Sequence, residues 1–105
     1  MQSILWFGPY IYLSPGIYNV TFVLSVTNNS QNNSYELLSW TRGGQVIFGS
    51  ANITGRDFPA IETWTNISMI VSINNVWNKI EFPAGYGHWK GTIAISGLDI
   101  KQISW

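Results

Sequence analysis

Apolar side chains recur at every second position from Tyr18 to Val26, and most of the positions between them are polar. Period two over nine residues indicates a β-strand with one face on a core and the other in solvent. At about 3.3 Å per residue such a strand spans roughly 30 Å, the height of a small β-sandwich. The preceding Ser14-Pro15-Gly16 predicts a tight turn, because Pro presets φ and Gly accepts a positive φ.

A second alternating strand is predicted at residues 64–73, and a third at residues 76–82 with Trp77, Lys79 and Glu81 facing outward. Shorter strands are predicted at residues 3–7, 10–13, 35–41, 45–48, 92–96 and 98–105. The segments 27–34, 49–60 and 83–91 are predicted to be loops or connections. The predicted core consists of Tyr18, Val20, Phe22, Leu24, Ile67, Met69, Val71, Ile80 and Phe82. Short strands separated by turns at this spacing predict an all-β fold, a two-sheet antiparallel β-sandwich of the jelly-roll type with about eight strands.

The composition narrows the classes of protein to which the chain can belong. Its 105 residues suit a single domain, 1–105. Only 10% of residues are charged, against about 25% in ordinary soluble domains, and five basic residues balance five acidic ones. A surface without a basic stripe argues against nucleic acid as a partner. No apolar run approaches the roughly 20 residues of a membrane span, so we expect no membrane insertion.

The segment GPYIYLSPGIYNVTFVL resembles the opening of jelly-roll modules related to carbohydrate-binding modules. The likeness continues through Asp57-Phe58, Trp64, the segment 79–82 (KIEF) and the segment 97–100 (GLDI). Such modules are extracellular accessory domains of bacterial and archaeal proteins. The resemblance implies a non-catalytic carbohydrate-binding-like module at the cell surface or in a secreted protein. The domain would then be a piece of a larger exported or surface protein, with a glycan as its partner.

Many modules of this kind hold a calcium ion between early acidic residues and an aspartate of the last strand. Asp99 matches the late ligand, whereas residues 1–17 contain no Asp or Glu. Calcium takes six to eight oxygen ligands, several of them anionic. We therefore expect no bound metal, and no other cofactor is implied.

Little in the sequence suggests catalysis. The chain has one histidine, no cysteine and no GxSxG segment. Asp57 and Glu62 could pair as glycosidase acids, but the plainer interpretation is that Asp57 closes a loop and Glu62 is a solvated strand residue. We predict that the protein is not an enzyme.

The most suggestive binding segment is rich in glycine and aromatic residues. Tyr86, His88 and Trp89 are interspersed with glycines, which let large rings stand out of a loop and stack on a sugar. Arg42 and His88 would donate hydrogen bonds to sugar hydroxyls, and Trp40 would wall the site. The alternative is that Tyr86 and Trp89 fold back and plug the open end of the sandwich. Trp64, at the head of a core strand, is predicted to be structural.

The competing function is a structural or assembly module, as in a surface layer, pilus or virion. Trp77 faces outward by alternation, so it is the candidate contact with a neighbouring protein subunit. A low surface charge fits this function as well as it fits glycan binding.

The tripeptide N-x-S/T, the acceptor for N-glycosylation, occurs five times. Asn19 and Asn66 fall on outward positions of predicted strands, and the others, at Asn28, Asn32 and Asn52, fall in predicted turns or loops. A glycan requires contact with solvent, which all five positions are expected to have. Together these sequons favour an extracellular or cell-surface location.

Overall fold

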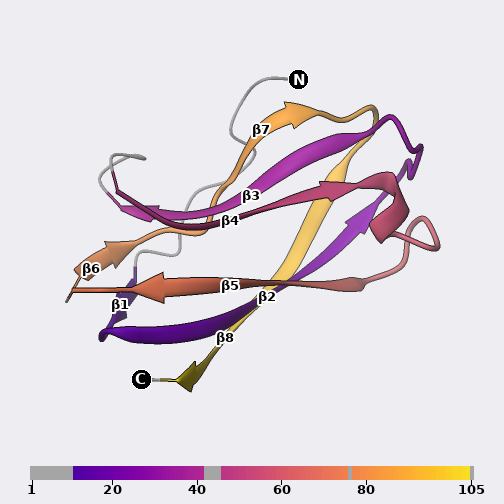
Figure 1. Ribbon diagram of the computed structural model, residues 1–105. Helices are drawn as coiled ribbons and strands as arrows, with labels where there is room; N and C mark the ends of the chain where they lie inside the picture. Colours follow the sequence, from indigo (N-terminus) through magenta and orange to yellow (C-terminus); the bar gives the residue numbers. More distant parts are fainter. Residues whose placement is uncertain (1–10, 42–45, 76, 105) are drawn as a thin grey trace.

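The computed structural model describes residues 11–41, 46–75 and 77–104 of the chain. These residues form eight strands and one short 3-10 helix (Figure 1). They are β1 (Ile11–Leu13), β2 (Gly16–Val26), β3 (Ser34–Thr41), β4 (Val46–Thr54), η2 (Gly55–Asp57), β5 (Thr65–Ile73), β6 (Trp77–Ile80), β7 (Ala84–His88) and β8 (Ile93–Ser104). No helix in this part of the chain is long and apolar enough to cross a membrane.

Two three-stranded antiparallel sheets make up the sandwich, with strand orders β5-β2-β8 and β4-β3-β7. A two-stranded antiparallel pair, β1-β6, lies at one end, and Figure 1 shows the two larger sheets as separate layers. The predicted two-sheet, all-β sandwich is therefore confirmed.

The long alternating strand β2 is the middle strand of its sheet, and it pairs with both neighbours along most of its length. Phe22, for example, lies between Ile67 of β5 and Leu98 of β8. Every second side chain of β2 enters the core, as predicted. The other predicted core residues are also buried except Ile67, which is partly buried against the core cluster.

Glu81 departs from its predicted exposure. It pairs with Trp40 through two backbone hydrogen bonds of 2.8 and 3.0 Å. Its neighbours Ile80 and Phe82 belong to the core cluster, so alternation directs Glu81 away from the core, as the sequence indicates. It is nevertheless only 5% exposed, and Trp40 beside it is 4% exposed. The prediction of an exposed Glu81 is wrong because this outer position is covered as well.

Three predicted boundaries are also wrong. The expected connection 49–60 begins as strand, because β4 continues to Thr54 while paired with β3. The expected loop 83–91 contains β7, which pairs with the other edge of β3. The two expected closing strands are one strand, β8, with a register shift between its pairs with Val23 and Leu24. The predicted first strand, at residues 3–7, lies outside the described residues.

A glycine permits the close approach of β7 to β3. Gly87 pairs with Tyr35, and a Cβ atom at Gly87 would lie 2.6 Å from the Tyr35 Cα atom. Such a contact is too short for any other residue without a backbone shift. The glycine-rich composition of this segment, read from sequence as a sign of a loop, is thus a condition for its pairing as a strand.

Candidate functional site

Three connections converge at one end of the sandwich (Figure 1), and we call this region the loop end (residues 27–33, 55–64 and 88–92). Asn33, only 2% exposed, joins two of the connections. Its side-chain Nδ2 donates to the carbonyls of Lys90 (3.1 Å) and Asn28 (3.2 Å), and its Oδ1 accepts from the Lys90 backbone N–H at 2.9 Å. The buried amide thus pairs with Lys90 in both directions, as a backbone group would in a sheet.

A capping box holds the third connection. The side chain of Thr54 accepts from the backbone N–H of Arg56 at 3.3 Å, and Asp57 Oδ2 accepts from the Thr54 N–H at 2.8 Å. Asn29 Nδ2 donates to the carbonyl of Phe58 at 2.7 Å and so ties this segment to the 27–33 loop. Asp57 therefore closes a turn, as the plainer interpretation predicts. Glu62 is exposed as expected, but it lies in a turn and not in a strand.

Trp89 plugs the loop end from inside. Its ring packs edge to face on Phe58, with ring centroids 5.8 Å apart and an interplanar angle of 82°. Phe58 is 1% exposed and Trp89 is 6% exposed. The prediction that Trp89 offers a stacking face to a sugar is therefore wrong, and the alternative of an aromatic plug is right for this residue. The side chain of Tyr86 lies outside the described part.

His88 and Trp40, which were predicted to line one site, lie near opposite ends of β3. His88 is exposed and pairs with Ser34 at the loop end. Trp40 is six residues further along β3, a distance of about 20 Å for an extended strand, and it is buried. Trp40 therefore cannot wall a pocket around His88. Arg42 and the side chain of Trp77 lie outside the described residues, although the Trp77 backbone pairs with Leu13.

The exposed aromatic residue of the loop end is Trp64, with 55% of its surface in solvent. It ends a short segment that we call the Trp64 turn (residues 61–64), which also exposes Ile61. The N–H of Glu62, whose φ is +55°, donates to the Val26 carbonyl at 2.8 Å. A positive φ at a residue other than glycine is uncommon and is maintained by its surroundings. The turn thus holds an indole in solvent on an anchored backbone.

The exposure of Trp64 contradicts the structural role predicted for it at the head of a core strand. A signal was available: the inward positions of β5 are Met69, Val71 and Ile73, all at odd numbers, whereas Trp64 has the even parity of the exposed positions. Its place directly before an alternating strand suggested a core residue, but the alternation itself favours the solvent side.

The chemistry available near the Trp64 turn is that of binding. The exposed side chains are an indole, an aliphatic group, a carboxylate and a hydroxyl, and the Thr63 hydroxyl donates to the Ile61 carbonyl at 3.1 Å. Asp99, the residue that matches a calcium ligand in related modules, is exposed on β8 and pairs with Thr21. Within the described ranges no three His, Cys, Asp or Glu side chains gather to hold a metal ion.

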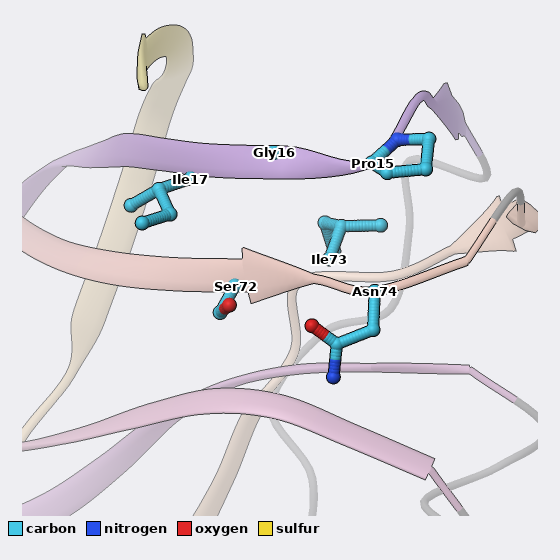
Figure 2. A pocket seen from close by; sticks show the side chains of 6 residues that line it. All are labelled: Pro15, Gly16, Ile17, Ser72, Ile73 and Asn74. Carbon is cyan, nitrogen blue, oxygen red and sulfur yellow. The ribbon is translucent and has the colours of Figure 1, made fainter. Parts of the chain in front are cut away.

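A groove of about 290 Å³ lies at the opposite end of the β2–β5 pair. Figure 2 shows its lining, which consists of Pro15, Gly16, Ile17, Ser72, Ile73 and Asn74. It offers a hydroxyl and an amide but no aromatic ring and no ionisable side chain. Its volume is at the lower limit of ligand pockets, about 300 Å³.

The five sequons are distributed over three regions. Asn28 and Asn32 lie in the 27–33 loop, as predicted, whereas Asn52 lies in β4 and not in a loop. Asn19 and Asn66 lie on the outer face of the β5-β2-β8 sheet. Asn32, Asn52 and Asn66 are exposed, and Asn19 and Asn28 are partly buried.

No protein-family model matches this sequence, and no curated protein matches it. The structure is similar to the C-terminal CBM6 of LamC, a marine laminarinase from Zobellia galactanivorans, with a TM-score of 0.67. The similarity covers 91% of this chain and 70% of the other, at 15% sequence identity. The chain has the jelly-roll fold of a CBM6 module. This finding confirms the resemblance to carbohydrate-binding modules at the level of the fold.

Proposed function

We propose that this chain is a non-catalytic carbohydrate-binding module of a larger secreted or cell-surface protein. The observation that carries the proposal is the common fold with the CBM6 module of LamC over 91% of the chain. The exposed indole of Trp64 supports it independently, because a flat ring in solvent can stack on the apolar face of a sugar. The capping box that occupies Asp57 argues against a pair of glycosidase acids.

The proposed binding surface is centred on the Trp64 turn. Trp64 supplies the stacking face, and the exposed Glu62 carboxylate accepts hydrogen bonds from sugar hydroxyls. His88, also exposed at the loop end, remains a candidate donor, as do Tyr86 and Arg42 outside the described side chains. One ring and a few hydrogen bonds correspond to millimolar to micromolar dissociation constants, about −4 to −8 kcal/mol.

The test compares two exposed apolar residues, Trp64 directly before β5 and Ile70 within β5. Trp64 is 55% exposed and Ile70 is 56% exposed, and the two lie six residues apart. Affinity electrophoresis of the unmodified protein, from a host that does not glycosylate, is run in gels containing β-glucans, xylan or mannan. The Trp64→Ala variant should lose the retardation that wild type shows, and Ile70→Ala should keep it. Retardation of Trp64→Ala equal to that of wild type would place the site elsewhere, and a wild type retarded by none of the polysaccharides would contradict glycan binding.

An assembly module is the second candidate function. The observation that favours it is a set of exposed apolar side chains away from the loop end, namely Tyr12, Ile47, Ile70 and Ile103. Single exposed apolar side chains are common on monomeric proteins. They favour the assembly function if they contact a second subunit, which the following experiment tests. Sedimentation equilibrium that shows a concentration-dependent dimer, weakened by Trp77→Ala, would favour assembly through the residue predicted for that role. A monomer at all concentrations tested would remove this candidate.

A further inference from the structure

Two sequons lie side by side on the outer face of the β5-β2-β8 sheet. One is Asn19-Val20-Thr21 of β2, and the other is Asn66-Ile67-Ser68 of β5. The antiparallel register places Thr21 opposite Ser68, and their hydroxyl oxygens are 2.9 Å apart. Asn19 and Asn66 consequently lie on opposite sides of this hydroxyl pair.

The surroundings of the sequon asparagines differ. Asn28 Oδ1 accepts from the Ser30 N–H at 2.8 Å, and Asn52 Nδ2 donates to the Ser34 hydroxyl at 3.1 Å. Asn19 is partly buried between its neighbours on β5 and β8. Asn32 and Asn66 are both exposed, and neither side chain has a hydrogen bond within the described part of the chain. The Asn66 Nδ2 can therefore carry a substituent without loss of a folded-state interaction. Asn66 differs from Asn32 in having an exposed indole, that of Trp64, two residues before it.

Trp64 lies two residues before Asn66. Along a strand, residues two apart point to the same face and are about 6.6 Å from each other, and Trp64 is the residue directly before the first residue of β5, Thr65. The even-numbered positions 66, 68, 70 and 72 of β5 are all exposed, and Trp64 has the same parity and the same exposure. A sugar attached to Asn66 would thus lie within reach of the indole face.

We propose that Asn66 is an N-glycosylation site and that Trp64 is the surface on which the first sugar of its glycan rests. In the modification, the amide nitrogen of Asn66 attacks C1 of a sugar carried on a polyprenyl diphosphate. The N–C1 bond forms, the C1–O bond to phosphate breaks, the diphosphate leaves with the electron pair, and the amide loses a proton to a base of the transferase. The carrier and the transferase are supplied by the secretory host.

The structure also sets the order of modification and folding. The Ser68 hydroxyl, which the sequon requires, is hydrogen-bonded to Thr21, and residues 66–68 are paired with β2. A transferase cannot reach the amide and this hydroxyl together while the β2–β5 ladder is formed. Transfer to Asn66 therefore precedes the pairing of β2 with β5.

A consequence for ligand binding rests on the function proposed above. The same indole face cannot stack on an external glycan while it supports the sugar on Asn66. The modified protein would therefore have its Trp64 turn covered, and the unmodified protein would have it open.

The first experiment measures occupancy. The chain is secreted from yeast, and its intact mass is recorded before and after an amidase removes N-glycans. Wild type should lose one glycan mass that Asn66→Gln never carried, whereas Asn74→Gln, a control at an exposed asparagine outside any sequon, should have the same glycan mass as wild type. Equal glycan masses in wild type and Asn66→Gln would overturn the proposal.

The second experiment measures packing of the sugar on Trp64. Since the amidase converts Asn66 to Asp, the glycosylated protein is compared with its own product and with an unglycosylated Asn66→Asp variant. The melting temperature should fall by roughly 4 °C on removal in wild type and stay unchanged in a Trp64→Ala background. An equal fall in both backgrounds, or none in wild type, would overturn the role of Trp64.

The outcome is separable from that of the proposed function. Unmodified wild type from a host that does not glycosylate is tested in the polysaccharide gels described above. If it binds none of the polysaccharides, the proposed glycan binding is wrong. The intact mass and the melting temperature still test whether Asn66 is glycosylated and whether its sugar packs on Trp64. If it binds and the Asn66-glycosylated form binds equally well, the mutual exclusion is wrong.

Discussion

The hydroxyl groups of Thr21 and Ser68 are hydrogen-bonded across the β2–β5 ladder, with 2.9 Å between their oxygen atoms. The pair is solvent-facing, so each hydroxyl exchanges water for the other at little net gain. A double-mutant cycle of Thr21→Val and Ser68→Ala, followed by urea unfolding, should give a coupling of roughly 0.2–1 kcal/mol. A coupling indistinguishable from zero would mean that the two hydroxyls act independently in solution.

Replacement of the buried Asn33 should be costly. Asn33→Ala removes four side-chain hydrogen bonds and leaves the backbone N–H and C=O of Lys90 without those partners. We expect the free energy of unfolding to fall by roughly 2–4 kcal/mol. Asn32→Ala, at the exposed neighbouring position, should change it by no more than about 0.5 kcal/mol. Similar losses in both variants would contradict the role assigned to the Asn33 amide.

Two tryptophans near the loop end should respond differently to truncation. Trp89→Ala removes a buried ring that packs on Phe58 and should lower the free energy of unfolding by about 3–5 kcal/mol. Trp64→Ala removes an exposed ring and should change the stability of the unglycosylated protein by about 0.5 kcal/mol or less. Thermal and chemical denaturation of the two variants check this contrast. A reversed order would show that the plug is Trp64.

The buried side chain of Glu81 should limit the stability of the fold. Within the part of the chain that the structure describes, its buried Oε2 has no hydrogen-bond partner. Glu81→Met keeps a similar volume and removes the unpaired buried oxygen, so it should raise the free energy of unfolding by roughly 1–3 kcal/mol. Glu62→Met, at an exposed position, serves as the control and should have little effect in the same urea titrations. A loss of stability in Glu81→Met would indicate that the carboxylate is satisfied in solution.

Stability should decrease at alkaline pH. Desolvation by burial raises the pKa of Tyr35 above its usual value near 10. Below about pH 10 the phenol is neutral in both the folded and the unfolded state, and its full contribution to the free energy of unfolding is present. As the pH rises further the unfolded state releases the proton first, so the free energy of unfolding falls until the folded-state pKa is passed. The difference between wild type and Tyr35→Phe in urea titrations at pH 9 to 11 measures this effect. A difference that does not vary with pH would contradict it.

The surroundings of the residues proposed for binding were predictable only in part. His88 was predicted to lie in a loop, whereas it is the last residue of β7, and its exposure agrees with the predicted role as a hydrogen-bond donor. Trp89 and Trp64 exchange the roles that the sequence suggested, since the glycine-flanked ring is buried and the ring before a core strand is exposed. Exposure of a loop aromatic depends on which side chain it meets, here Phe58, and that partner is 31 residues away in the chain.

What the sequence alone determined is the alternation of the two long strands. Side chains of a strand point to opposite faces by backbone geometry, so the inward positions of β2 and β5 follow from local pattern. The tertiary structure decided which outward positions are covered, as at Trp40 and Glu81, and which glycine-containing segments become strands, as in β4 and β7. Those outcomes depend on partners distant in sequence, whose backbone hydrogen bonds and covering surfaces leave no periodic trace in the chain itself.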